Sequence, residues 1–181
     1  STREIFMELP YHSWEEVKTQ LTISGKIQKE WKESSIDSRI EMVQNAIDYF
    51  KSNADTIAKN ITQQMGKPIS QSKNEVKGTI HRAEICCSLA EDALKDITLP
   101  EKEGFQRFIR RESLGVVLDI AAWNYPLLIA VNVVVPAILA GNAVTIKHSS
   151  LTPLCAIAFE DAFKQAGAPD GLVTALIMDH N

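Results

Sequence analysis

Residues 115–154 constrain the fold most strongly, because apolar runs alternate there with turn-forming residues. Val116–Ala121 is short, apolar and rich in β-branched residues, which is typical of a buried parallel strand. Residues 125–140 are apolar almost throughout, with a proline in the first turn and a glycine after the end, as in a buried helix. Residues 143–147 are again a short apolar run. The order strand, helix, strand predicts a right-handed βαβ unit.

Three helices are predicted before this unit, two of them from apolar residues that recur at steps of three and four. The first begins at Ser13, because Ser13 and Glu16 form the pattern of a capping box, and Gly25 weakens its middle, where it could fray or break. The second is predicted as one long helix over residues 40–65. The third begins near residue 70 and continues toward Pro100.

After the central unit, Thr152 and Pro153 begin a further helix, and residues 173–178 form a third predicted strand. Strands that alternate with helices indicate a parallel, doubly wound sheet. We therefore predict an α/β fold in which N-terminal helices precede a truncated Rossmann-like parallel sheet of the order β-α-β-α-β. We expect one structural domain, in which residues 1–112 supply helices and a charged strand or arm, and residues 113–181 form the dinucleotide-binding unit.

The composition argues against several classes of protein. With 181 residues and a net charge of −4, the chain can build one domain and has no basic excess to attract nucleic acid. Residues 125–140 are too short for a membrane span and are interrupted by Pro136. Three cysteines, two of them adjacent, make a poor disulfide framework, and the four isolated histidines show no metal-ligand spacing. We expect a cytoplasmic protein without nucleic-acid, membrane or metal binding and without a signal peptide.

Polar residues follow the first two strands of the predicted sheet. Trp123 and Asn124 come after the first strand, and Lys147 and Ser150 end or follow the second. Ligands of open α/β sheets bind outside the carboxyl ends of the strands, so these residues are candidates for a binding site. Asn124 can act as the N-cap of the next helix, or its carboxamide can donate to a developing negative charge. Lys147 is either a binder of anions or hydroxyls or a solvated strand end.

Several motifs occur in order along the chain: Met-Gly-Lys-Pro from residue 65, Gly-Val-Val from 115, Trp-Asn-Tyr-Pro from 123, Pro-Ala-Ile-Leu-Ala-Gly-Asn from 136, Val-Thr-Ile-Lys from 144, and Gln-Ala-Gly-Ala-Pro from 165. Together they resemble the N-terminal, coenzyme-binding part of the aldehyde dehydrogenase superfamily. The resemblance implies oxidation of an aldehyde to a carboxylic acid with hydride transfer to NAD or NADP. It assigns Asn124 to the oxyanion hole, as the catalytic residue of this chain. The coenzyme contacts that it implies are Ile120, Ala121, Ala122, Trp123, Lys147 and Ser150.

Three positions depart from the family pattern. Ser150 stands where many NAD-preferring relatives carry glutamate, which leaves the use of NADP open. Ala122 replaces the usual proline before the Trp-Asn pair, and Asp119 stands where a small or apolar residue is usual. Asp119 is therefore either near a strand end or a buried acid that needs a partner.

The resemblance also implies what this chain lacks. The family's nucleophilic cysteine and general-base glutamate are expected beyond Asn181, so we expect this chain to be inactive alone and to meet an aldehyde only within a complete enzyme. Cys155 is interpreted as a core residue. The charged segment 105–111 resembles an arm that reaches a partner subunit, which favours a homo-oligomer, and a charged edge strand is the alternative. A non-catalytic module that binds nucleotide or associates with itself is the alternative function.

Overall fold

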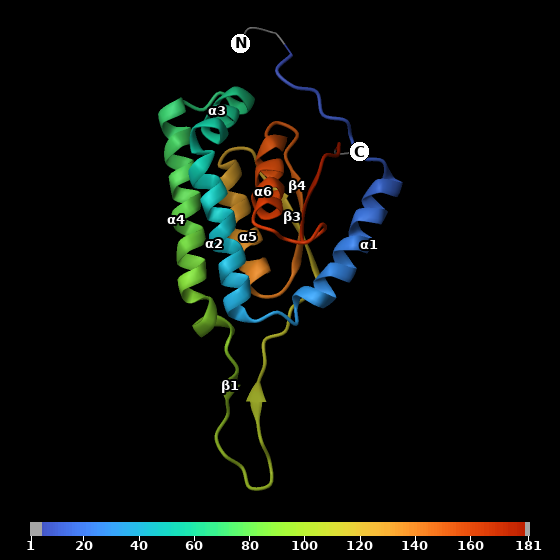
Figure 1. Ribbon diagram of the computed structural model, residues 1–181, viewed down its shortest axis with the longest axis vertical. Coiled ribbons are helices and arrows are strands. Elements are labelled where there is room, and N and C mark those ends of the chain that lie inside the picture. Colours follow the sequence, from blue (N-terminus) through green and yellow to red (C-terminus); the bar gives the residue numbers. More distant parts are fainter. Residues whose placement is uncertain (1–4, 180–181) are drawn as a thin grey trace.

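A three-stranded parallel sheet lies at the centre of the molecule, in a computed structural model that describes residues 5–179 (Figure 1). Its strands, in the order β3-β4-β5, are β3 (Val116–Ala121), β4 (Ala143–His148) and β5 (Val173–Leu176). Helix α5 (Pro126–Leu139) connects the first two strands, and α6 (Pro153–Gln165) connects the second to the third. This arrangement confirms the predicted Rossmann-like β-α-β-α-β unit, with a third strand shorter than predicted.

Helices cover both faces of this sheet (Figure 1). Helices α5 and α6 pack on one face, and α2 (Ile36–Ser52) and α4 (Ile69–Leu94) pack against them from outside. Helix α1 (Trp14–Trp31) lies on the other face, mainly against β4. Strands β4 and β5 are consequently buried almost completely, whereas β3 alternates between buried and more exposed positions.

The N-terminal helices differ from the prediction at one point. The long helix predicted over residues 40–65 is wrong, because the chain forms α2 and then α3 (Ala54–Met65), with Asn53 between them. Asn53 leaves the helical conformation (φ −106°, ψ 11°), and its side-chain amide donates to the carbonyl oxygen of Tyr49 at 2.9 Å. Ser13 forms the predicted capping box, and α1 continues through Gly25 without a break.

The core joins the N-terminal helices to the Rossmann-like unit. Helix α5 carries fully buried aliphatic side chains, which is why its sequence is apolar all round. The indole of Trp31 donates to the carbonyl oxygen of Ile138 at 3.0 Å, and Arg39 donates to that of Leu139 at 3.1 Å. These bonds satisfy carbonyls at the carboxyl end of α5 that have no partner within the helix.

A hairpin projects from the lower end of the molecule in Figure 1. It consists of β1 (Ile97–Thr98) and β2 (Phe108–Ile109), which pair antiparallel and form a small sheet of their own. Residues 105–111 therefore belong to a hairpin arm rather than to an edge of the parallel sheet. Among the described residues, no helix combines the length and apolar character needed to cross a membrane.

Candidate functional site

The predicted coenzyme contacts meet at the carboxyl ends of β3 and β4. Ile120 lies beside Lys147 in the parallel register, and Ala121 lies beside His148. Because side chains alternate along a strand, Ile120 and Ala121 point to opposite faces. Ala121 is buried at 3% exposure, whereas Ile120 is 71% exposed beside the half-buried Lys147. An apolar side chain and a lysine thus share an open face of the sheet at the end where α/β proteins bind ligands.

The turn after β3 carries Ala122, Trp123 and Asn124, all of them exposed. The interpretation of Asn124 as the N-cap of α5 is wrong. Tyr125 occupies that position, and it makes no side-chain capping bond. The carboxamide of Asn124 is thus not used to cap the helix.

A buried carboxylate from α4 caps helix α5 instead. Glu75 Oε1 accepts from the backbone amide of Leu127 at 3.0 Å and more weakly from that of Leu128 at 3.4 Å. These are amides of the first turn, which lack partners within the helix and carry the positive end of its dipole. A carboxylate fits this position better than the amide oxygen of Asn124 would, because its charge also interacts with that dipole.

Lys67 completes this arrangement under the turn. Its Nζ forms a buried ion pair with Glu75 Oε2, donates to the backbone carbonyl oxygen of Asn124 at 3.0 Å, and lies 4.3 Å from the centre of the Tyr125 ring. Lys67 belongs to the Met-Gly-Lys-Pro motif, but the sequence alone predicted no role for it or for Glu75. The available signal was a lysine after a glycine stop, followed eight positions later by a glutamate on the buried face of the next helix.

His148 links the loops that follow β3 and β4. Its Nε2 lies 3.1 Å from the carbonyl oxygen of Pro126, and its Nδ1 lies 3.0 Å from the hydroxyl of Thr152. Burial lowers the pKa of this imidazole below its ordinary value, which favours the neutral ring. In the neutral tautomer that satisfies both contacts, Nε2–H donates to Pro126 and Nδ1 accepts from Thr152.

A cleft of about 540 Å³ opens beside Ser150, at the carboxyl ends of β4 and β5. Its walls include apolar side chains from the N-terminal segment, from the loops after both strands and from the start of α6: Ile5, Phe6, Met7, Leu9, Leu151, Leu154, Ile177 and Met178. No acidic side chain occurs among residues 147–151. The cleft therefore has an apolar wall, a serine hydroxyl, and no carboxylate in the loop after β4.

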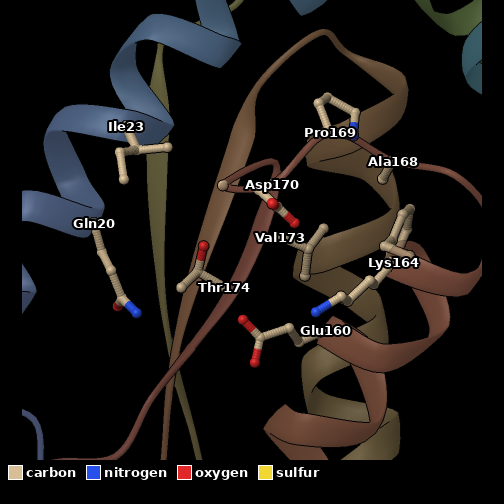
Figure 2. Close-up of a pocket in the computed structure, with 11 residues that line it drawn as sticks. Gln20, Ile23, Glu160, Lys164, Ala168, Pro169, Asp170, Val173 and Thr174 are labelled. Carbon is tan, nitrogen blue, oxygen red and sulfur yellow. The ribbon is translucent and has the colours of Figure 1, made fainter.

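A smaller cleft of about 270 Å³ lies at the open edge of β5, between α1 and α6 (Figure 2). Gln20, Thr174 and Glu160 point toward it from three different elements. Burial raises the pKa of Glu160, and a hydrogen bond from the backbone amide of Ala175 opposes that rise. None of the residues predicted for the site lines this cleft, so the candidate site remains at the carboxyl ends of β3 and β4.

The aldehyde dehydrogenase family model matches the chain over residues 1–181. The chain belongs to the aldehyde dehydrogenase family. It is 32% identical, over 96% of its length, to a 3,6-anhydro-α-L-galactose dehydrogenase of Streptomyces coelicolor, and 32% identical, over its whole length, to a succinate semialdehyde dehydrogenase [NAD(P)+] of Escherichia coli. It spans 35% and 39% of the lengths of these two relatives.

Solved structures with the same fold match nearly the whole of this chain. Gox0499, studied for its selection of cofactor and substrate, is 30% identical to this chain, with a TM-score of 0.89. The match covers 95% of this chain and 38% of the Gox0499 chain. The glyceraldehyde-3-phosphate dehydrogenase GapN of Methanocaldococcus jannaschii, solved with NADP, is 28% identical with a TM-score of 0.88. This match covers 97% of this chain and 39% of the GapN chain. The chain thus corresponds to the N-terminal part of an aldehyde dehydrogenase.

Asp119, the departure from the family pattern on β3, is a buried acid. Its side chain is 4% exposed, and Oδ2 has no hydrogen-bond partner. Burial raises the pKa of this carboxyl to about 6, because the charged form loses its hydration without a compensating partner. Of the two interpretations that the sequence left open for Asp119, the structure thus supports the buried acid.

The cysteines of this aldehyde dehydrogenase chain are poor nucleophiles. Cys155 is 2% exposed at the start of α6, and burial raises the pKa of its thiol strongly, which confirms it as a core residue. Burial also raises the pKa of Cys86, and that of Cys87 to about 11. A thiol with a raised pKa holds little of the reactive thiolate near neutral pH. Within residues 5–179, no group of three or more histidine, cysteine or acidic side chains could hold a metal ion.

Proposed function

We propose that this chain supplies the coenzyme site and the oxyanion-stabilising asparagine of an NAD(P)-dependent aldehyde dehydrogenase, which oxidises an aldehyde to a carboxylic acid. One observation carries the proposal: Ile120 and Lys147 lie side by side at the carboxyl edge of the sheet that also carries the Asn124 turn. The aldehyde would be bound and oxidised in the complete enzyme.

The residues around this edge fit a dinucleotide. Lys147 would contact a ribose hydroxyl, with Ser150 in the following loop, while Ile120 offers an apolar surface on the open face of β3. Ala121, Ala122 and Trp123 would flank the coenzyme along the strand end and turn. When bound, NAD or NADP supplies the acceptor for the hydride. Because the loop after β4 has no carboxylate, it would not repel the 2′-phosphate of NADP.

Asn124 would stabilise the negative oxygen that forms when a nucleophile attacks the aldehyde. Its carboxamide is exposed at the end of the turn, and Glu75 rather than Asn124 caps the helix. The amide N–H groups of Asn124 are thus left to donate to an oxyanion. A preorganised donor of this kind contributes roughly 3 kcal/mol to the transition state.

Calorimetric titration of the chain with NAD and with NADP tests the coenzyme site. We expect saturable binding that Lys147→Ala weakens at least tenfold, which corresponds to about 1.4 kcal/mol. Lys59→Ala is the matched control, because it removes an exposed lysine on α3 and should leave binding unchanged. Equal binding by wild type and Lys147→Ala would contradict the assignment of Lys147.

We further propose that the hairpin arm contacts a second copy of the chain. Phe105, Phe108 and Ile109 are exposed on the arm. Apolar side chains gathered on a projecting element favour burial in an interface. Sedimentation velocity at several concentrations should show a dimer or larger species, and Phe105→Ser with Phe108→Ser should shift it toward monomer. A wild-type chain that is monomeric throughout would contradict this proposal, which also covers the alternative of a self-associating module.

We propose the cytoplasm as the compartment of this protein. All three cysteines are free, and two of them, Cys86 and Cys87, are adjacent on α4. Free cysteines are compatible with a reducing compartment. Fractionation of cells that express the protein tests this assignment.

A further inference from the structure

Lys67 and Glu75 form a buried ion pair directly beneath the Asn124 turn. Lys67 is 8% exposed and Glu75 is 3% exposed. Both come from a part of the chain more than 45 residues before the turn. Both residues of the pair bond to the backbone at this point. Lys67 Nζ donates to the carbonyl oxygen of Asn124 in the turn, and Glu75 Oε1 accepts from the amide of Leu127 in the first turn of α5.

Burial of this pair is not explained by stability alone. Removing two charges from water is costly, and apolar replacements of buried ion pairs are often neutral or stabilising. What the pair provides is geometry, because it holds both sides of one turn. The bond from Lys67 fixes the carbonyl of Asn124, the ammonium holds the ring of Tyr125, and Glu75 fixes the first amides of α5. The contacts of Lys67 thus converge on the peptide unit that joins Asn124 to Tyr125.

We propose that Lys67 and Glu75 are positioning residues for Asn124: together they hold the backbone from which its carboxamide projects. The use of that carboxamide as an oxyanion donor rests on the proposed function. The positioning itself does not, and it can be measured without coenzyme or aldehyde. A preorganised donor needs such support, because a donor that must be reoriented during the reaction stabilises the transition state less.

The test is a set of ¹H–¹⁵N spectra of the 181-residue chain. The double variant Lys67→Met with Glu75→Gln removes both charges but keeps an oxygen that can accept from Leu127. The matched control is Lys73→Met with Asp55→Asn, which removes an exposed ion pair of 2.9 Å between α4 and α3. Asn124→Asp identifies the side-chain amide signals of Asn124 by their loss.

We expect the Lys67/Glu75 double variant to shift the Asn124 and Tyr125 signals and to lower the backbone order parameter of Tyr125 from about 0.85 toward 0.6. The indole signal of Trp31, which reports the distant bond to Ile138, should stay in place and show that the fold is intact. The control variant should leave all these signals unchanged.

Unchanged Asn124 and Tyr125 signals in the folded double variant would overturn the proposal, as would equal shifts in the control. If the double variant does not fold, Glu75→Gln alone is measured in the same way, with the same expected shifts. Titration of the same samples with NAD and NADP reports separately on the proposed function. Failure of the wild type to bind coenzyme would refute the coenzyme site and leave the positioning result standing.

Discussion

The imidazole of His148 holds the hydroxyl of Thr152 at 3.0 Å, and its other nitrogen lies 3.1 Å from the carbonyl oxygen of Pro126. One buried side chain thus ties the first residue of α5 to the N-cap of α6. These are the helices that begin after the two candidate loops. Since Thr152 is fully buried, its hydroxyl depends on this contact.

His148→Gln should therefore destabilise the chain and change its response to acid. Glutamine can still donate to Pro126 but leaves Thr152 without its partner, at a cost of about 1–3 kcal/mol. Burial lowers the pKa of His148 in the folded state below the ordinary value of 6.5, so the unfolded state takes up its proton first. The wild type should lose stability as the pH falls below 6.5, and urea unfolding at several pH values should show a smaller loss for the variant.

The charged groups around His148 affect this test. Glu75 favours its protonated form, and Lys147 disfavours it, but neither outweighs burial. The difference between wild type and variant isolates the histidine from other titrating groups. A variant with the same acid dependence as the wild type would show that His148 does not titrate in this range.

Asp119→Asn should stabilise the chain at neutral and higher pH. Burial raises the pKa of Asp119 from 3.8 to about 6, so the folded state binds the proton more tightly than the unfolded state. The resulting loss in the free energy of unfolding is fully present above pH 6 and disappears as the pH falls from about 6 to 3.8. A shift of this size corresponds to as much as about 3 kcal/mol. Urea unfolding at pH 8 and at pH 4 measures it.

The gain from Asp119→Asn should be large at pH 8 and small at pH 4, because the wild-type carboxyl is mostly neutral at the lower pH. Asp37→Asn serves as control, since Asp37 is exposed in the first turn of α2. An equal effect of Asp119→Asn at both pH values would contradict the assigned burial of its charge.

The central unit could be predicted from local patterns. Val116–Ala121 is rich in β-branched residues, and the helix that follows it is apolar on nearly all sides. Both signals depend on residues close in sequence. The helix is buried as its pattern predicts, whereas Val116, Leu118 and Ile120 of the strand are exposed, because none of the described helices covers them fully. The position of Lys147 beside Ile120 then follows, because parallel strands joined by one helix align their carboxyl ends.

Contacts between distant segments could not be predicted in this way. Asparagine is a common N-cap residue, which favoured Asn124 for this role. Instead Glu75, more than 45 residues earlier, accepts from the first backbone amides of α5. The periodicity of residues 40–65 continues across Asn53, so the break appears only where the Asn53 side chain bonds to Tyr49. In both cases a local preference was overridden or redirected by a specific hydrogen bond.

The 181-residue chain should form no NADH or NADPH when it is mixed with an aldehyde and coenzyme. Cys155 is enclosed in the core, and the thiols of Cys86 and Cys87 have raised pKa values. A thiol-reactive dye should modify the native chain slowly and the unfolded chain rapidly. Detectable aldehyde-dependent formation of NADH or NADPH by the pure chain would contradict this prediction.

Ser150→Glu should change the preference between the two coenzymes. A glutamate in the loop after Lys147 can accept from a ribose 2′-hydroxyl but repels a 2′-phosphate, whereas serine permits both. We expect the affinity for NADP to fall at least tenfold, about 1.4 kcal/mol, while that for NAD is kept or improved. Calorimetric titration with both coenzymes measures the two changes. Ser70→Glu adds the same charge at an exposed position of α4 and should leave both affinities unchanged, so an equal loss of NADP binding in both variants would argue against a contact at Ser150.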